Sequence, residues 1–446
     1  MYYGLLNVTI IRFCLFFMLY SDARSPVFDP SHRVFIDTIP ETLYQKMESV
    51  LCDQYHFKNG QKQGGRMCLA TNFVGVDQRL ATQLFALGKQ LTQQFSGQVF
   101  TQVLPDGFSP PQENLSSLER QGDAAFFHLD VAITADGPKL IEFQAVPTYQ
   151  VTAARLGSLL QQEQLPQSQL FLGDRDYQWH DFKRIMQDVL SAGASGGQVI
   201  MDRHIQQQKT NFEFYATQTE ILPEIEVVDA HQVYAQDGAL YFQNKQAQAT
   251  QIQRLYNRVL TLEAIDDDHY PHPADPWHFR YDQPYQGLEY CNHPAYSFMF
   301  AKQQLTQVIH PFNPQCYELA ETATLFMTGE LACEDYVWKH KLGVAGREIF
   351  LSPTIEILQQ LQAEQVLEQY IAQQKVQFHP FLSADQQEKI VELRLMFVQS
   401  PTDLIAVPMA RIGHLAQMQS GQIEPRIHFA DNNKPGYGFA PVVLHS

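Results

Sequence analysis

The stretch AAFFHLDVAITADGPKLIEFQAV, residues 124–146, decides the fold more than any other part of the sequence. Two apolar runs typical of β-strands flank an Asp-Gly pair at residues 136–137, and such a pair is typical of the tight turn of a β-hairpin. Asp130 lies on the first strand, and Glu142 and Gln144 lie on the second. We therefore expect an antiparallel hairpin with three oxygen-bearing side chains.

The length of the hairpin loop decides whether these side chains meet. Glu142 and Gln144 leave the same face of their strand, because side chains alternate along a strand. A loop of three or five residues would place Asp130 opposite Glu142 and His128 opposite Gln144, with Gly137 in a bulge conformation. A loop of two or four residues would place them on opposite faces. Two carboxylates and an amide oxygen among apolar neighbours suit Mg²⁺; the alternative is an ordinary hairpin whose polar face meets water.

Helical and strand-like segments surround the hairpin. Apolar spacing predicts helices over residues 41–54, 78–95, 151–162, 179–193, 295–308 and 354–364. Apolar runs predict a strand-loop-strand over 336–352 and strands over 365–371, 391–399 and 404–413. Helices and strands in this mixture indicate an α+β fold.

The middle of the chain has a different order of elements. A short apolar strand (197–202), a polar helix (207–219) and a second strand (225–230) form a β-α-β unit of Rossmann-like type. A second Asp-Gly hairpin follows at 233–244, and IQRLYNRVL at 252–260 closes the unit. The Pro-, His- and Asp-rich stretch 266–286 is the best candidate for a linker.

Composition limits the class of protein. The 446 residues are 45% hydrophobic and 12% aromatic, which excludes a disordered chain. A net charge of −17 argues against a nucleic acid or an anionic membrane as the main partner, since both need a basic surface. The six cysteines are scattered without a CxxC pair, so we expect reduced thiols in a cytoplasmic protein rather than a disulfide scaffold or a zinc site.

The first residues, 1–26, form an N-terminal extension that fits neither a signal peptide nor a membrane span well. Their apolar stretch is split by Arg12 and has no basic residue in front of it, as a signal peptide would need. We interpret Met18 as the true start of translation. A poor signal or membrane anchor, or an ordinary N-terminal strand or helix, are the alternatives, and no other membrane contact is expected.

Two further segments carry residues suited to binding a nucleotide. Lys339 ends a predicted strand and is followed by Gly343 and Gly346, whose backbone N–H groups can approach anion oxygens. The strand QVLEQYI carries Glu368 and Gln369, which suit contacts with an adenine and a ribose. A plain hairpin loop and a plain core strand are the alternatives for these two segments.

Charged residues on the last two predicted strands form a third group. Glu392 and Arg394 leave one face of a strand, and Arg411 on the next strand is placed to join Arg394 near a charged ligand. Ion pairs facing solvent are the alternative.

In this order, the segments resemble the circularly permuted ATP-grasp ligases, which include glutathionylspermidine synthetase and uncharacterised relatives. In that family an Arg-x-Asp strand is followed, twelve residues after the Asp, by a Glu-x-Asn strand. Here HLD at 128–130 and EFQ at 142–144 match, and Glu142 is the twelfth residue after Asp130. In the permuted branch these metal-binding strands precede the nucleotide lysines, as they do here. The resemblance implies that Asp130 and Glu142 bind magnesium, with Gln144 in place of the usual Asn.

The family's nucleotide segments also have counterparts. Lys302 matches a lysine on a helix, and KHKLGVAG at 339–346 matches a strand and loop of the form K-P-x-x-G-R-x-G. His128 replaces the family's phosphate-contacting Arg, and Val344 replaces its loop Arg. Arg347, three residues on, is a candidate substitute for the latter.

The resemblance implies an ATP- and Mg²⁺-dependent ligase that joins a carboxylate to an amine through an acyl phosphate. It implies a circularly permuted ATP-grasp fold with an N-terminal core part (27–170), a Rossmann-like pre-ATP-grasp unit (171–290) and a nucleotide-clamping part (291–446). The candidate residues are, for catalysis, His128, Arg258, Arg347 and Arg394; for the nucleotide, Lys302, Lys339, Gly343, Gly346, Glu368, Gln369 and Arg411; and for the metal, Asp130, Glu142 and Gln144.

Two other functions stay open. The departures at His128 and Val344 favour a nucleotide-binding regulatory protein that keeps the fold without turnover. A phosphotransferase that uses the same site without forming an amide is the third possibility. The partners expected in each case are small molecules.

Overall fold

The structure is a computed structural model that describes residues 29–60, 67–95, 111–260, 279–343, 348–384, 386–417, 423–427 and 436–446. Several predictions fall elsewhere in the chain. The N-terminal extension, Val344, Gly346, Arg347 and most of the predicted linker lie outside the described residues. Within the described residues, none of the helices has the length and apolar character needed to cross a membrane.

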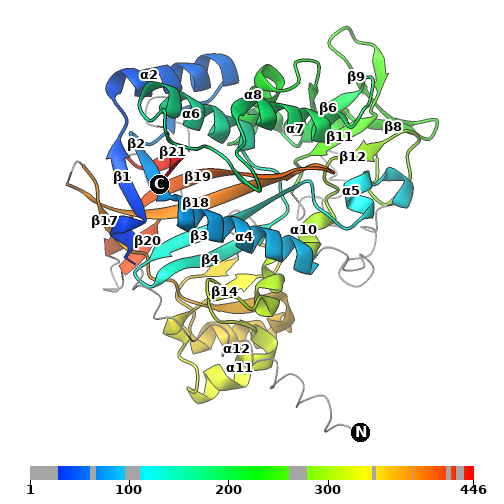
Figure 1. The fold of residues 1–446 in the computed structure, drawn as a ribbon. Helices are drawn as coiled ribbons and strands as arrows, with labels where there is room; N and C mark the ends of the chain where they lie inside the picture. The colour runs from blue at the N-terminus through cyan, green and yellow to red at the C-terminus, as the bar shows by residue number, and fades with distance from the viewer. Residues whose placement is uncertain are drawn as a thin grey trace.

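A mixed sheet of ten strands forms the centre of the molecule (Figure 1). Along its main path it comprises β1 (Val34–Thr38), β2 (Asn72–Asp77), β21 (Gly438–His445), β19 (Leu404–Gln417), β18 (Glu388–Gln399), β3 (Phe126–Thr134) and β4 (Gly137–Gln144). Three short strands join it beside this path: β5 (Leu172–Gly173), β17 (Phe381–Leu382) and β20 (Ile423–Arg426). With helices packed on this sheet, the α+β class is confirmed.

Segments from the two ends of the described chain meet in this sheet. β2 pairs in parallel with β21, and β1 pairs antiparallel with β2. None of these three strands was predicted as part of the sheet. Strand pairing between segments so far apart in the sequence has no local signal, because periodicity reports only a segment's own face.

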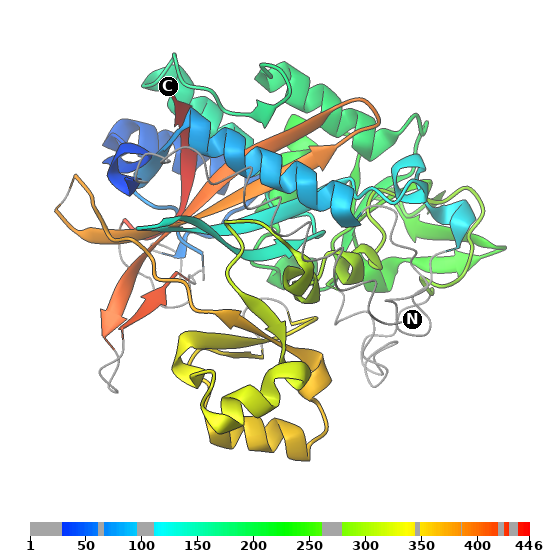
Figure 2. The same cartoon turned by 60° about the horizontal axis from the view of Figure 1, so that its bottom comes forward.

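Helices cover both faces of the central sheet (Figures 1 and 2). On one face α4 (Gln78–Phe95) packs its leucines against Phe127 and Phe397. The other face is covered by α2 (Glu41–Ser49), with the π-helical turn Val50–Gln54, and by α6 (Gln150–Glu163), α7 (Trp179–Ser191) and α8 (Phe212–Glu220). The helices predicted over 41–54, 78–95, 151–162 and 179–193 are confirmed to within two residues at their ends.

The decisive hairpin is present, but its register has a different cause from the predicted one. Thr134 pairs with Gly137, so the loop has two residues rather than three or five. A bulge between Asp130 and Val131 then leaves Ile141 without a partner in the ladder. This extra residue restores the predicted pairing of Asp130 with Glu142, because one inserted residue turns the following side chains to the other face.

A separate parallel sheet lies beside the central one, in the order β12-β11-β6-β7. Its strands are β6 (Gln198–Asp202), β7 (Glu226–Asp229), β11 (Arg254–Asn257) and β12 (Glu289–Tyr290). The Rossmann-like β-α-β unit is therefore confirmed, although α8 begins at Phe212 and the predicted helix residues 207–211 do not belong to it. The second Asp-Gly hairpin forms β8 (Tyr234–Gln236) and β9 (Ala239–Gln243), and β9 also pairs with β10 (Ala249–Gln251) in a small sheet.

The third part is a small antiparallel sheet with two helices, at the lower end of the view in Figure 2. It comprises β13 (Cys316–Glu318), α11 (Leu319–Thr328), β14 (Tyr336–His340), β15 (Ile349–Phe350), α12 (Ile355–Ala363) and β16 (Tyr370–Gln374). The strand predicted over 365–371 has the wrong bounds, because a 3-10 helix covers Leu367–Gln369 and the strand β16 starts only at Tyr370. The helix predicted over 295–308 is divided into α10 (Tyr296–Met299) and a 3-10 helix (Lys302–Gln307).

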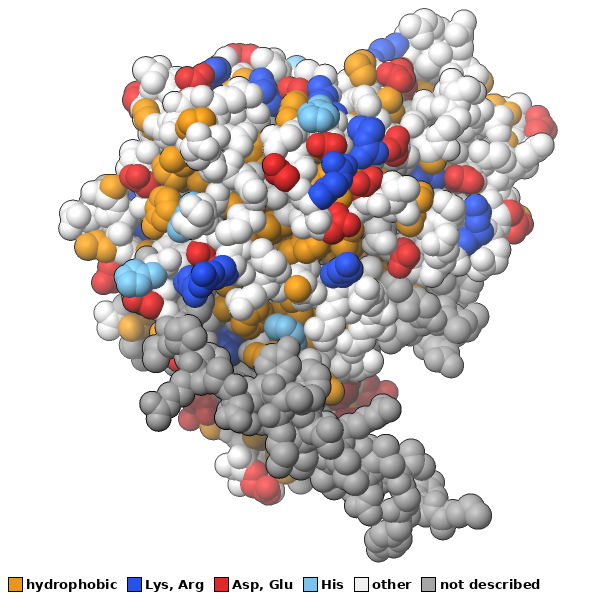
Figure 3. All heavy atoms as spheres, viewed as in Figure 1, with side chains coloured by type: hydrophobic (Ala, Val, Ile, Leu, Met, Phe, Trp, Pro, Cys, Tyr) orange, Lys and Arg blue, Asp and Glu red, His pale blue; other side chains and the backbone are white. Residues whose placement is uncertain are grey.

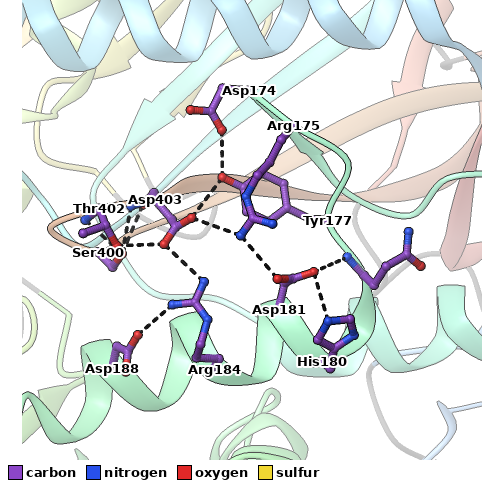
Figure 4. A network of polar contacts seen from close by, with 11 residues as sticks. Asp174, Arg175, Tyr177, His180, Asp181, Arg184, Asp188, Ser400, Thr402 and Asp403 are labelled. Carbon is purple, nitrogen blue, oxygen red and sulfur yellow. Dashed lines mark hydrogen bonds and ion pairs between the residues drawn. The ribbon is translucent and has the colours of Figure 1, made fainter.

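A polar network ties the turn between β18 and β19 to α7 (Figure 4). Asp403 in this turn accepts hydrogen bonds from Arg175 (3.4 Å), Tyr177 (3.2 Å) and Arg184 (3.3 Å). Figure 3 shows the result on the surface, where basic and acidic side chains crowd together over α7. The network joins the central sheet to the helix that leads into the parallel sheet.

Replacing Asp403 with asparagine is expected to lower the free energy of unfolding by about 1 to 2 kcal/mol. Burial opposes ionisation of Asp403, but hydrogen bonds from Thr402, Arg184 and Arg175 outweigh it and lower the pKa. The stabilisation is therefore present above the pKa of an unfolded aspartate and is lost as the pH falls below it. Urea denaturation at neutral and acidic pH measures the difference. The matched control is Asp188→Asn, whose carboxylate pairs with Arg184 at half-exposed positions and is expected to contribute less than about 0.5 kcal/mol.

Candidate functional site

The centre of the candidate site is the buried carboxylate of Asp130 on β3. Arg394, its direct partner on β18, binds it through two hydrogen bonds of 2.6 and 2.5 Å. Arg411 on β19 donates a third at 2.6 Å. Burial alone would raise the pKa of this carboxyl, but the two guanidinium groups outweigh it and hold the pKa far below its usual range. Asp130 is therefore charged at neutral pH.

A second carboxylate, Glu392, pairs with Arg411 across the strands β18 and β19. Burial raises the pKa of Glu392 to about 7, and the nearby negative charge of Asp130 acts in the same direction. Near pH 7 Glu392 is thus only partly ionised. Asp130 supplies most of the negative charge that balances the two arginines.

Glu142 and Gln144 stand on the neighbouring strand β4, opposite Asp130 and His128. Lys302, at the start of its 3-10 helix, places its ammonium 3.2 Å from the Glu142 carboxylate and also donates to the Gly343 carbonyl. Burial opposes ionisation of Glu142, but Lys302 outweighs it and lowers the pKa of the carboxyl. Lys302 thus joins the central hairpin to the loop after β14.

The bulge in the hairpin provides a hydrogen-bond acceptor for Lys339. The ladder leaves Ile141 unpaired, and its carbonyl accepts a 3.0 Å hydrogen bond from the Lys339 ammonium. Gln373 on β16 accepts a second one at 2.5 Å and donates to the Leu140 carbonyl. Burial lowers the pKa of Lys339 to about 8. The small sheet thus presents a buried lysine, still mostly charged at neutral pH, to the edge of the central sheet.

His128 is buried in the same row as Asp130. Its Nδ1 lies 3.2 Å from the Val146 carbonyl, which can only accept, so the ring proton is on Nδ1. Nε2 has no hydrogen-bond partner among the described residues. Burial, together with the charge of Arg394, lowers the pKa of this histidine to about 4. At neutral pH His128 is uncharged and Nε2 offers a lone pair.

Nine of the predicted residues thus come together from distant parts of the chain: His128, Asp130, Glu142, Gln144, Lys302, Lys339, Gly343, Arg394 and Arg411. A small pocket beside them is lined by Gln144, Lys341 and Gly343. Exposed side chains of Glu368 and Gln369 lie on the 3-10 helix before β16, and the Gln369 carbonyl accepts from the Lys341 backbone. Arg258 lies elsewhere, directly after β11 of the parallel sheet.

Two residues at the site were not predicted. Gln373 holds Lys339, and the ring centre of Tyr149 lies 5.6 Å from the Arg394 guanidinium carbon. A glutamine in a strand gives no signal of its own. For Tyr149, the sequence offers one indication that it lies near the site: it follows the hairpin closely, five residues after Gln144.

The charges make the site a basic region in an acidic protein. Four basic side chains meet two ionised carboxylates and the partly protonated Glu392. All four basic side chains are buried or largely buried, where electrostatic attraction is stronger than in water. An anion with several oxygens, such as a phosphate chain, fits this arrangement.

The donors suit Mg²⁺ by type, because carboxylate and amide oxygens on one face are ligands that this ion prefers. The oxygens are engaged, however: both of Asp130 accept from arginine, and Glu142 is bound by Lys302 and Gln144. No group of three His, Cys, Asp or Glu side chains in the described part of the chain is placed to hold a metal ion. Metal binding at Asp130 therefore requires that another anion takes over its arginines.

Comparisons with known proteins give only distant similarity, and only to solved structures. No family model matches the chain, and no curated protein matches it. Among solved structures, it is similar to one described as "Putative gamma-glutamylcysteine synthetase" from Methylobacillus flagellatus KT, with 12% sequence identity and a TM-score of 0.39. The match covers 78% of this chain and 87% of the other. A similarity this distant assigns neither a fold family nor a function.

Proposed function

We propose that this protein is an ATP-dependent ligase that joins a carboxylate to an amine through an acyl phosphate. One observation carries the proposal: strands and loops separated by up to 281 residues bring four buried basic side chains around the Asp130–Glu142 pair. A buried basic cluster of this kind has a physical reason to exist if it binds a polyanion. The proposed fold is the circularly permuted ATP-grasp fold, in a cytoplasmic protein, with parts at 27–170, 171–290 and 291–446.

In this proposal the small sheet and the central hairpin hold the phosphates between them. Lys302 and Lys339 neutralise phosphate oxygens. Glu368 and Gln369 contact the nucleoside, for which their exposed position beside the end of β14 leaves room. The protein's contribution is mainly to position the reactants and to neutralise their charge.

Magnesium would bind on Asp130, Glu142 and Gln144 and would act as a Lewis acid toward phosphate oxygens. The phosphates of ATP would replace the Asp130 carboxylate as the anion that pairs with Arg394 and Arg411. Asp130 would then be released from its ion pairs when the nucleotide is bound. The same exchange predicts that the ion binds weakly in the absence of nucleotide.

The regulatory alternative is supported by His128. This neutral side chain stands where a permanent positive charge would assist phosphate transfer, and its pKa of about 4 keeps it uncharged at neutral pH. Such a protein would bind Mg-ATP without turnover.

Measurement of ADP release separates these functions. With Mg-ATP, we expect ADP release above background only when a suitable carboxylic acid and a suitable amine are both present, with an amide as product. Glu142→Gln is expected to lower that rate by about 100-fold or more, because it removes a charge from the proposed metal site. The control is Glu163→Gln, whose carboxylate forms an exposed pair with Lys46. Tight Mg-ATP binding without ADP release for any acid and amine would favour the regulatory protein, and ADP release with an acceptor but no amide would favour a phosphotransferase.

A further inference from the structure

Buried polar atoms without hydrogen-bond partners gather at the carboxyl edge of the parallel sheet. They are Arg258 Nε, Gln150 Nε2 and Thr148 Oγ1, in residues that are 7%, 0% and 8% exposed. Most buried polar groups in native proteins have a partner, and a lost partner costs about 1–3 kcal/mol. Three such atoms belong to residues that contact one another, and a ligand that accepts and donates hydrogen bonds there would give them partners.

Hydrogen bonds join these three residues into one cluster. The Arg258 guanidinium donates to the Thr148 carbonyl and, at 3.0 Å, to Thr210 Oγ1. The Thr148 backbone N–H donates to Gln150 Oε1 at 3.1 Å, which leaves the Gln150 amide NH₂ to donate elsewhere. The guanidinium also lies 5.1 Å from the ring centre of Phe214. The Arg258 and Gln150 side chains and the Thr148 backbone are thus held by other contacts, and the guanidinium also interacts with the Tyr256 hydroxyl. Arg258 Nε, Gln150 Nε2 and Thr148 Oγ1 themselves have no hydrogen-bond partner among the described residues.

The charge of the cluster shows which ligand fits. Arg258 has no carboxylate within ion-pair distance among the described residues. Glu213 is near enough to interact with it electrostatically, but its carboxylate accepts from the backbone N–H groups of Val151 (2.8 Å) and Thr152 (3.0 Å), and burial raises its pKa to about 7. A buried cation without a paired anion is unfavourable, so an anionic ligand is expected.

The cluster is also placed where substrates bind in folds of this kind. Arg258 directly follows β11, and open α/β sheets bind ligands beyond the carboxyl ends of their strands. Tyr149, between Thr148 and Gln150, contacts Arg394 of the basic site. The cluster therefore adjoins the proposed phosphate site through a single residue.

We propose that Arg258, Gln150 and Thr148 bind a carboxylate of a small organic acid, which accepts from Arg258 Nε and Gln150 Nε2. A planar carboxylate with two acceptor oxygens matches two donors and one hydroxyl. The assignment of this acid as the ligase's carboxylate substrate rests on the proposed function; its binding to the cluster does not.

Thermal-shift measurements with succinate, glutarate and L-glutamate, each with and without Mg-ADP, test the proposal. We expect at least one acid to raise the melting temperature of the wild type, and its neutral diamide to have no effect. Arg258→Gln is expected to weaken the affinity for that acid roughly 10- to 100-fold. Arg258→Lys, which keeps the charge but loses the Nε–H, is expected to restore part of it.

Arg254→Gln is the matched control, because Arg254 is also buried, at the start of the strand that Arg258 follows, but pairs with Glu289 at 3.0 Å. It is expected to lower stability and to keep the response to acids. If no acid stabilises a wild type that binds Mg-ATP, or if Arg258→Gln keeps the full response, the polar atoms bind water only and the proposal is wrong. Stabilisation by an acid without any response to Mg-ATP would support this site and would contradict the proposed function instead.

Discussion

Replacing Lys339 with methionine is expected to weaken the binding of Mg-ATP by about 100-fold or more, while the protein stays folded. A hydrogen bond between a buried ammonium and a phosphate oxygen is worth up to about 3 kcal/mol, which corresponds to this factor. Methionine keeps the length of the side chain and removes a charge whose burial is unfavourable, as the pKa of Lys339 of about 8 shows. Titration calorimetry gives the affinity, and circular dichroism shows that the fold is retained.

The pH dependence of stability and of Mg-ATP affinity provides a second test of Lys339. Between about pH 8 and the higher pKa of an unfolded lysine, the unfolded chain binds more protons than the folded one, so this residue makes the fold more stable as the pH rises. The affinity for Mg-ATP is expected to change in the opposite direction, since the ammonium is lost above about pH 8. Lys339→Met should lose both dependences. Lys183→Met is the control, because Lys183 on α7 pairs with Glu220 on α8 and lies away from the site, with its side chain 35% exposed. Equal affinities of wild type and Lys339→Met would exclude Lys339 from the nucleotide site.

Replacing Asp130 with asparagine is expected to lower the free energy of unfolding by about 3 to 5 kcal/mol, since breaking a buried ion pair leaves its partners uncompensated. Asp130 is 1% exposed, and its loss leaves Arg394 and Arg411 with only the partly protonated Glu392. The wild type should lose this stabilisation only as the pH falls below about 4, because the folded pKa lies below that of an unfolded aspartate. Urea denaturation at several pH values measures both effects.

Nucleotide binding to Asp130→Asn shows whether this carboxylate also holds metal. If it does, the variant should lose affinity for Mg-ATP but bind ATP in EDTA at least as tightly as the wild type, because two arginines become available to the phosphates. A variant that is as stable as the wild type would contradict the ion pairs, and an unchanged affinity for Mg-ATP would contradict metal binding at Asp130.

The local pattern of the hairpin predicts the part of the site formed by Asp130 and Glu142, whereas the grouping of Lys302 and Lys339 with them follows from the family resemblance and not from local patterns. The hairpin, its Asp-Gly turn and the pairing of Asp130 with Glu142 are all present in the structure. The bulge at Ile141 was not predictable, since nothing in the apolar run distinguishes a two-residue loop with a bulge from a longer loop. Yet the bulge supplies the Ile141 carbonyl, which accepts a hydrogen bond from Lys339.

The remaining features that the sequence did not predict depend on tertiary contacts. The strand order of the central sheet depends on pairing between β2 and β21, which are separated by most of the chain. The segment 365–371 has the apolar character of a strand, but Leu367–Gln369 within it form a 3-10 helix, and the side chains of Glu368 and Gln369 are exposed. Arg258 was predicted as a ligand residue from its position after the last strand of the α/β unit, and only the structure shows its unpaired Nε beside Gln150 and Thr148.

Titration of the wild-type protein with Mg-ATP at neutral pH tests the central claim most directly. We predict saturable binding of one nucleotide per chain, with a dissociation constant between roughly 1 μM and 1 mM, and a loss of about 100-fold in Lys339→Met. Absence of saturable binding to a wild type that circular dichroism shows to be folded would contradict the account.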